Sequence, residues 1–188
     1  MPSTFYTHGG PKMQTNGIAL IGYRATGKST VARLLATALA WECIDTDDEI
    51  QLRAGKTIAQ VFTEQGEEAF RDIETAVIRE NARRASCVLT LGGGAVLRAE
   101  NRHLLESCLT VWLTATAATI HERLVADEQS SSRRPQLTNA GGLAEIEELL
   151  AQRQPIYRLC ADLVVETEGK TPREVTDELL RQIRADGS

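Results

Sequence analysis

Short apolar runs alternate with amphipathic helical patterns along almost the whole of this chain. The apolar runs are typical of β-strands and lie at 17–22, 42–44, 87–91, 109–113 and 161–166. Between them, apolar residues recur at the three- and four-residue spacing of a helix with one buried face, first in 29–41. Strands that alternate with such helices form a parallel sheet with right-handed crossovers on both faces. The pattern predicts an α/β fold, a three-layer α/β/α domain on a five-stranded parallel sheet.

The composition excludes several classes of protein. Of 188 residues, 42% are hydrophobic, and 26 acidic against 21 basic side chains give a formal net charge of −5. This apolar content excludes a disordered tail, and no stretch approaches the roughly 20 apolar residues of a membrane-spanning helix. The acidic balance argues against a nucleic-acid-binding surface. We therefore expect neither a membrane nor a nucleic acid as partner, and an anionic ligand would need a few concentrated positive groups.

The domain organisation is simple, because the chain has no repeat and no internal linker. Residues 1–16 are largely polar and lack the basic and apolar regions of a signal peptide, so we expect a flexible N-terminal extension and a cytoplasmic protein. Residues 17–188 are expected to form one domain and to act as a monomer. The polar, Ser- and Gly-rich stretch 127–142 is a surface loop or, in a phosphate-handling enzyme, a lid.

The cysteines argue against a metal site built on soft ligands. The chain has four cysteines, Cys43, Cys87, Cys108 and Cys160, and no two of them form a C-x-x-C pair. The first three lie in or beside apolar runs, and the histidines lie apart from all four. We expect buried free thiols in a reducing compartment.

The strongest motif is a complete phosphate-binding loop, G-x-x-x-x-G-K-[ST], which reads Gly22-Tyr23-Arg24-Ala25-Thr26-Gly27-Lys28-Ser29. It lies between a predicted strand and a predicted helix, as its chemistry requires. Backbone N–H groups of such a loop surround a phosphate, Lys28 reaches the β- and γ-phosphates, and the Ser29 hydroxyl can ligate Mg²⁺. The motif predicts that the chain binds a nucleoside triphosphate.

Two carboxylates follow the second predicted strand. Asp45 and Asp47 stand at its carboxyl end, on the sheet edge that carries the phosphate loop, where open α/β sheets bind their ligands. An i, i+2 pair leaving an extended strand directs both side chains the same way. One could hold Mg²⁺ through water while the other accepts the proton of an attacking hydroxyl. Asp48 and Glu49 are expected to be solvated.

Three glycines and an arginine indicate where an acceptor could bind. Gly92, Gly93 and Gly94 follow the third predicted strand and allow a ligand to approach the backbone closely, so we expect them to form a wall of the acceptor pocket. Arg71 precedes Glu74 by three residues on a predicted helix, and Glu74 could hold its guanidinium in place. By spacing alone, however, the pair is more simply a surface ion pair.

In their order along the chain, these motifs resemble the shikimate kinase family. The resemblance extends from about Gly17 to the final helix and rests on the phosphate loop, Asp45-Thr46-Asp47, Gly66-Glu67 followed by Phe70-Arg71 and Glu74, the triple glycine, Arg134-Pro135, and Arg153-x-Pro155-x-Tyr157. It implies a P-loop NTPase fold with acceptor-binding helices at about 46–80 and a lid at about 127–142. It also implies ATP-dependent, Mg²⁺-dependent phosphorylation of shikimate to shikimate 3-phosphate, a step of chorismate and aromatic amino acid biosynthesis.

The resemblance further implies a role for each matched residue. Nucleotide would be bound by Gly22, Ala25, Thr26, Gly27, Lys28, Ser29, Thr30, Arg123, Arg134, Lys170 and Pro172. Ser29 and Asp45 would hold the metal. The acceptor would be bound by Asp47, Arg71, Gly92, Gly93, Gly94 and Arg153, with the two arginines on its carboxylate. Catalysis would rest on Lys28, Asp47 as the base, and Arg134.

Two positions depart from the family pattern. Ala25 stands where the family usually has glycine, and its methyl group requires a backbone that avoids strongly positive φ. Arg133 precedes Arg134, and Gln136 follows Pro135 where the family tends to have leucine. Either arginine could therefore be the one that contacts phosphate.

Two alternative functions remain open. The first is a kinase of the same fold for another small hydroxy acid such as gluconate, because any compact polyhydroxy acid could satisfy two arginines and an aspartate. The second is a non-catalytic, shikimate-kinase-like domain that binds ligand and regulates a partner. Loss of Lys28, Asp47 or Arg71 would indicate the second, and all three are present.

Overall fold

A parallel sheet of five strands lies at the centre of the computed structural model, which describes residues 17–126 and 142–186. The strands are β1 (Gly17–Ile21), β2 (Glu42–Asp45), β3 (Cys87–Thr90), β4 (Cys108–Thr114) and β5 (Leu163–Glu166), in the order β2-β3-β1-β4-β5. The first strand is central and pairs with β3 on one side and β4 on the other. The fold predicted from the apolar runs is confirmed.

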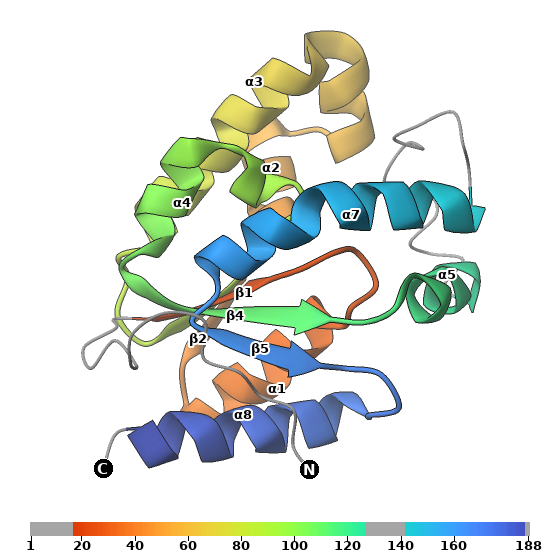
Figure 1. The fold of residues 1–188 in the computed structure, drawn as a ribbon. Helices are drawn as coiled ribbons and strands as arrows, with labels where there is room; N and C mark the ends of the chain where they lie inside the picture. The colour runs from red at the N-terminus through yellow and green to blue at the C-terminus, as the bar shows by residue number, and fades with distance from the viewer. Residues whose placement is uncertain (1–16, 127–141, 187–188) are drawn as a thin grey trace.

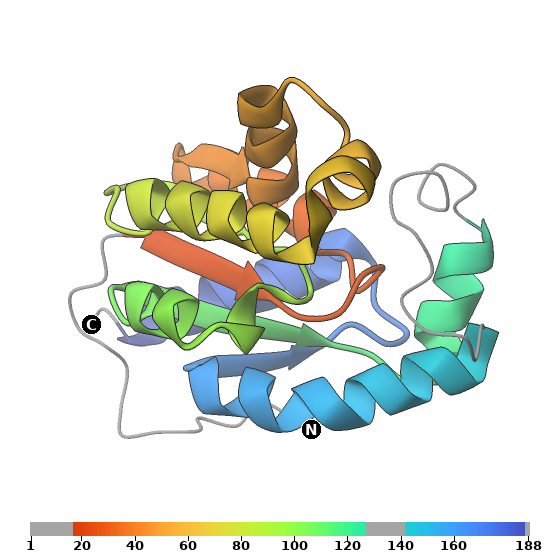
Figure 2. The same cartoon turned by 90° about the horizontal axis from the view of Figure 1, so that it is seen from above.

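Helices cover both faces of this sheet (Figure 1). One face carries α1 (Lys28–Leu39) and α8 (Pro172–Asp186), which pack against each other. The other carries α3 (Ile58–Asn81), α4 (Ala99–Leu105) and α7 (Gly142–Cys160), which lie in a row across the sheet in Figure 2. The remaining elements are α2 (Thr46–Ala54), the short 3₁₀ helix η1 (Ala95–Leu97) and α5 (Ala117–Ala126).

Two apolar clusters fill the space between the sheet and its helices. The cluster under α3, α4 and α7 includes Ile21, Leu89, Leu91, Trp112 and Tyr157. The cluster under α1 and α8 includes Leu20, Val31, Leu35, Val111 and Leu179. Because the central strands are buried on both faces, their sequences are continuously apolar rather than alternating. This double burial is why the strands could be found from sequence.

The last strand begins two residues later than predicted, at Leu163 rather than at residue 161. The backbone N–H of Ala161 donates to the Tyr157 carbonyl at 3.0 Å, which extends the helical bonding of α7. The Asp162 carboxylate then accepts a hydrogen bond from the Thr110 N–H at 2.8 Å. One helical hydrogen bond and one long-range bond to β4 therefore delay the strand despite the apolar run.

The expectation of buried thiols is wrong for one cysteine. Cys87 and Cys108 are buried and Cys160 is half-buried, but Cys43 is exposed. It lies on β2, which is an edge strand, and only Ile44 of that strand is buried. An apolar neighbour in sequence therefore does not ensure a buried thiol where the sheet ends.

Residues 46–80, expected to bind the acceptor, fold as α2 and most of α3 around a small apolar cluster of their own. That cluster contains Ile50, Ile58, Val61, Phe70 and Val77. Gly66 interrupts α3 with a φ of 86° and a ψ of 173°, a conformation that a side chain would disfavour. The chain therefore bends here, and its second part runs on across the sheet as the segment that carries Arg71.

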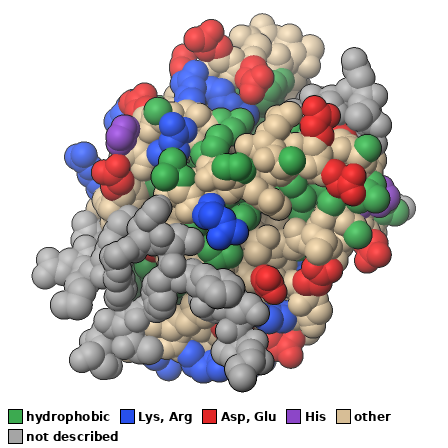
Figure 3. Space-filling model, in the orientation of Figure 1, with side chains coloured by type: hydrophobic (Ala, Val, Ile, Leu, Met, Phe, Trp, Pro, Cys, Tyr) green, Lys and Arg blue, Asp and Glu red, His purple; other side chains and the backbone are tan. Residues whose placement is uncertain are grey.

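Charged side chains of both signs are interspersed over the described residues on the face shown in Figure 3. Within residues 17–126 and 142–186, no helix has the length and apolar character needed to cross a membrane.

Candidate active site

The phosphate loop connects β1 to α1, in the strand–loop–helix setting that was predicted. Gly22 has a φ of 136°, and a Cβ atom there would lie 2.3 Å from the Leu113 carbonyl oxygen, so this position accepts only glycine. The Lys28 ammonium donates to the carbonyl oxygens of Gly22 and Tyr23 at 2.9 and 2.7 Å. The lysine thus lies along the inner side of the loop, ready to exchange carbonyl for phosphate oxygens.

The expected conformation of Ala25 is wrong. Its φ is 59°, in the left-handed region that the methyl group was expected to exclude. A left-handed non-glycine residue costs roughly 1–2 kcal/mol and persists only where its surroundings hold it. Arg123 Nη1 donates to the Ala25 carbonyl at 3.3 Å and contributes to that restraint.

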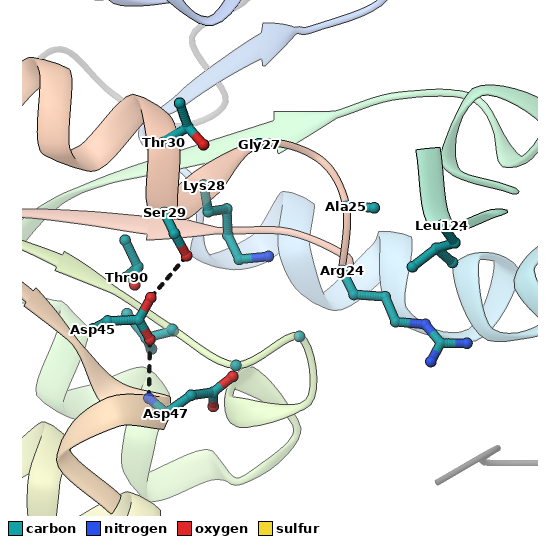
Figure 4. Close-up of a pocket in the computed structure, with 13 residues that line it drawn as sticks. Arg24, Ala25, Gly27, Lys28, Ser29, Thr30, Asp45, Asp47, Thr90 and Leu124 are labelled. Carbon is teal, nitrogen blue, oxygen red and sulfur yellow. Dashed lines mark hydrogen bonds between the residues drawn. The ribbon is translucent and has the colours of Figure 1, made fainter. Parts of the chain in front are cut away.

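The two carboxylates after β2 line the same cavity, although not in the predicted geometry (Figure 4). Asp45 accepts hydrogen bonds from the Ser29 hydroxyl at 2.7 Å and from the Asp47 N–H at 3.0 Å. The second bond caps α2, so Asp47 belongs to the first helical turn rather than to an extended strand. The capping turn, and not strand alternation, directs both side chains to the loop.

This first cavity has a volume of about 250 Å³ and lies beside the phosphate loop at the carboxyl edge of the sheet. It is lined by Arg24, Ala25, Gly27, Lys28, Ser29, Thr30, Asp45, Asp47, Thr90, Leu91, Gly92, Gly93 and Leu124. The predicted phosphate, metal and base positions thus meet here with two of the three glycines. Arg24, Thr90, Leu91 and Leu124 were not predicted, and only the charge of Arg24 at a variable loop position could have drawn attention to it.

Arg71 adjoins this cavity but is not among its lining residues. Its Nη1 donates at 2.8 Å to Glu74, which is fully buried, and its Nη2 lies 3.2 Å from Glu67. With a side chain only 14% exposed, Arg71 is not the surface ion pair that spacing alone favours, and the expected support from Glu74 is confirmed. A Cβ on Gly94 would lie 2.5 Å from Arg71 Nη2, so the guanidinium rests on the glycine turn.

Burial lowers the pKa of the Arg71 guanidinium, but the charge of Glu74 and the hydrogen bonds from Glu74 and Glu67 outweigh it, and the pKa rises above its ordinary value. Arg71 is therefore positively charged at neutral pH.

Two side chains of α7 meet the same region from the opposite side. Arg153 is only 9% exposed, and its guanidinium carbon lies 5.7 Å from the centroid of the Tyr23 ring. The Tyr157 hydroxyl donates to the Gly93 carbonyl, which fixes the middle of the triple glycine. The third predicted acceptor element, Arg153-x-Pro155-x-Tyr157, thus adjoins both the phosphate loop and the glycine turn.

A second cavity of about 210 Å³ lies on the other side of the phosphate loop. The outer nucleotide positions suggested by the resemblance gather here, since its lining includes Arg123, Lys170 and Pro172 together with Thr26 of the loop. Arg123 also donates to the Thr167 carbonyl at 2.8 Å, and Lys170 pairs with Glu178 at 2.7 Å. Lys170 and Pro172 are close in sequence, but sequence proximity gave no sign that Arg123 would join them.

Part of the predicted site lies outside the described residues. Arg134, its neighbour Arg133 and nearly all of the predicted lid fall within 127–141. The lid and the choice between the two arginines therefore stay predictions.

A phosphate loop at the end of the central strand, faced by two carboxylates from the neighbouring connection, defines a P-loop kinase. The family model described as shikimate kinase matches residues 24–184. The chain belongs to the shikimate kinase family.

Curated relatives and solved structures agree with this assignment. The chain is 40% identical over 163 residues to the shikimate kinase of Rhodopirellula baltica, covering 86% of this chain and 87% of that one. It is 42% identical over 167 residues to that of Chromohalobacter salexigens, covering 89% and 91%. Shikimate kinase from Acinetobacter baumannii in complex with shikimate superposes with a TM-score of 0.85 at 33% identity, covering 93% and 96%. A gluconokinase from Sinorhizobium meliloti, with a TM-score of 0.55 at 16% identity, shares the fold alone.

Proposed function

We propose that this chain transfers the γ-phosphoryl group of ATP to the 3-hydroxyl of shikimate, giving ADP and shikimate 3-phosphate. The observation that carries the proposal is the meeting of the phosphate loop, Asp47 and the glycine turn in one cavity, in a chain of the shikimate kinase family. The matching structure that contains shikimate supports the choice of acceptor.

Transfer forms a bond between the acceptor oxygen and the γ-phosphorus and breaks the bond between that phosphorus and the bridging oxygen, which leaves with ADP. Asp47 orients the acceptor hydroxyl and receives its proton, while Lys28 binds the phosphate oxygens. A loose transition state develops little charge on the acceptor, so a carboxylate of ordinary basicity is sufficient. The main task of the protein is alignment of the two reactants.

The residues present fit a magnesium ion bound together with nucleotide. The Ser29 hydroxyl and the Asp45 carboxylate are hard oxygen donors 2.7 Å apart at the loop. Among the described residues, no group of three or more His, Cys, Asp or Glu side chains could hold a metal alone, which suits an ion that takes few protein ligands and several phosphate or water oxygens. Bound there, Mg²⁺ would neutralise phosphate charge; Ser29 and Asp45 would position it.

The acceptor would lie against the glycine turn with its carboxylate toward Arg71 and Arg153. The two arginines come from α3 and α7, so they approach from different directions and fix orientation as well as charge. Gly93 would present its backbone to the ligand, with Tyr157 holding its carbonyl. Arg123, Lys170 and Pro172 would surround the adenine in the second cavity.

The proposal includes the setting of the enzyme. The product would serve chorismate and aromatic amino acid biosynthesis in the cytoplasm, and the enzyme would act as a monomer of one domain, residues 17–188. Closure of the predicted lid would exclude water and bring Arg134 or Arg133 to the phosphates. Size-exclusion chromatography with light scattering tests the oligomeric state directly.

A coupled assay of ADP formation tests the activity. Shikimate, gluconate and other small hydroxy acids are supplied in turn, with and without Mg²⁺. We expect ADP formation that needs both shikimate and Mg²⁺. Turnover of gluconate in preference to shikimate would favour the first alternative, and binding of shikimate without turnover would favour the regulatory domain.

Replacement of Asp47 tests the base. Asp47→Asn keeps the shape of the side chain but removes its negative charge, so we expect kcat to fall by about 10²–10⁴-fold with the KM for ATP unchanged. The matched control is Asp48→Asn, one residue further on the same helix, where the side chain is exposed. A kcat for Asp47→Asn equal to that of the control would remove Asp47 from the mechanism.

A further inference from the structure

Arg24 is a cation of the first cavity to which neither the motif nor the resemblance assigns a role. It occupies a variable position of the phosphate loop and lines the cavity. Figure 4 shows its side chain leaving the loop in the direction of Leu124, away from Lys28 and on the other side of the opening from Asp45 and Asp47. Its guanidinium therefore lies apart from Lys28, the side chain expected to receive the phosphates.

The guanidinium of Arg24 makes no hydrogen bond or ion pair with the residues that the structure describes. Its Nε atom is buried and makes no hydrogen bond. Arg153, also buried, likewise has no hydrogen bond or ion pair within residues 17–126 and 142–186. Five other arginines have carboxylate partners, Arg53, Arg71, Arg79, Arg84 and Arg98, and exposed ones without such a partner, such as Arg158, are solvated. Since a buried unpaired N–H is destabilising, the two unpaired arginines mark a place where an anion would be favourable.

Arg24 and Arg153 meet at one aromatic ring. Their guanidinium carbons lie 5.8 and 5.7 Å from the centroid of Tyr23, which is 1% exposed. The ring stabilises each cation, but it supplies no negative charge and accepts no hydrogen bond from either guanidinium group. Tyr23 cannot move away, because it packs in the apolar cluster with Ile120 and Leu149. An anion that reached both guanidinium groups would supply the charge and the hydrogen-bond acceptors that the ring cannot.

We propose that Arg24 is a specificity-determining residue that binds the carboxylate of the acceptor together with Arg153. The inference rests on the proposed function and deepens it, because it places part of the selection for a carboxylic acid in the phosphate loop itself. The acceptor's carboxylate is the anion that suits this position, since Lys28 and the loop N–H groups already receive the phosphates. Arginine's planar fork allows two parallel hydrogen bonds to the carboxylate.

The test compares Arg24→Met with wild type in the ADP-formation assay. Methionine keeps the length and apolar stem of the side chain but removes the charge and the donors. We expect the KM for shikimate to rise about 10- to 100-fold, as for loss of a hydrogen bond to a charged group. Neither kcat nor the KM for ATP should change more than about twofold, because uniform binding affects neither. The matched control is Arg158→Met, an exposed arginine that lies 5.7 Å from the Trp112 ring.

An uncharged acceptor distinguishes a direct contact with the carboxylate from a purely structural role of Arg24, which would affect charged and uncharged acceptors alike. In the analogue, a hydroxymethyl group replaces the carboxylate of shikimate. Wild type should use it poorly, and Arg24→Met should use it no worse than wild type does. Arg24→Lys keeps the charge without the fork and should fall between wild type and Arg24→Met for shikimate. Thermal unfolding confirms that each variant is folded.

Three results would overturn the proposal: an unchanged KM for shikimate in Arg24→Met, an altered kcat or KM for ATP at unchanged acceptor KM, or an equal loss with the uncharged analogue. The second would assign Arg24 to phosphate. Failure of the proposed function has a different signature, because wild type itself would then show no shikimate-dependent ADP formation. In that case calorimetric titration of wild type and Arg24→Met with shikimate decides, and equal affinities would overturn the proposal.

Discussion

Removal of the Arg71 guanidinium should separate a structural role from a binding role. The group that we assign to the acceptor's carboxylate also neutralises Glu74, which is 0% exposed and accepts its hydrogen bond at 2.8 Å. Arg71→Met leaves that carboxylate buried without its cation. Breaking a buried pair in this way typically destabilises by about 3–5 kcal/mol, and since Arg71 is itself slightly exposed we expect the lower end, about 3 kcal/mol.

The double variant Arg71→Met/Glu74→Gln distinguishes the structural role of Arg71 from its role in binding the acceptor. Glutamine has nearly the shape of glutamate but no charge, so most of the lost free energy of unfolding should return, to within about 1 kcal/mol of wild type. The KM for shikimate should stay raised about 10- to 100-fold in the single and the double variant alike, because neither can offer a guanidinium to the acceptor. Stability is measured by urea unfolding and KM by the coupled assay.

An exposed pair between α3 and α4 provides the control. Arg79 and Glu100 are paired, with side chains 54% and 56% exposed, so Arg79→Met should cost less than about 1 kcal/mol and leave KM unchanged. If Arg71→Met were no more destabilising than Arg79→Met, the reasoning about a buried charge would be refuted. If the double variant bound shikimate as wild type does, Arg71 would not be a carboxylate ligand.

Two further substitutions probe backbone positions. Gly94→Ala places a Cβ 2.5 Å from Arg71 Nη2 and must displace a guanidinium that Glu74 holds. The KM for shikimate should therefore rise about tenfold at nearly constant kcat. An unchanged KM would show that the guanidinium does not rest on this glycine. Ala25→Gly removes the strain of a left-handed alanine and should raise the free energy of unfolding by up to about 1 kcal/mol. Ala40→Gly, at a φ of 54°, should do the same, whereas Ala32→Gly inside α1 should lower the free energy of unfolding. Destabilisation by Ala25→Gly would contradict the reasoning.

The sequence was sufficient for the sheet, the phosphate loop and the residues around it, because each depends on local signals. Doubly buried strands are continuously apolar, and the loop motif combines glycines with a lysine at fixed spacing. The position of Asp45 after β2 was equally clear. These features can be predicted without knowing how distant segments pack against each other.

Other features depend on long-range packing and could not be read from spacing. Arg71 is buried because its face of α3 lies against the turn that contains Gly94, which is far away in sequence. The exposure of Cys43 follows from the place of β2 at the sheet edge. Asp47 became helical because Asp45 caps α2 instead of continuing the strand. In each case a tertiary contact or a capping bond prevailed over the local pattern.

The side chain of Tyr23 packs the phosphate loop firmly against α5 and α7. The loop's backbone borders the first cavity, while the Tyr23 ring is embedded with Ile120 of α5 and Leu149 of α7. Close-packed interiors do not deform gradually, so a shift of the loop has to carry these helices with it or open a void around the ring. Since α5 ends at Ala126 and α7 begins at Gly142, a displacement of the Tyr23 ring would reach both described residues that flank 127–141.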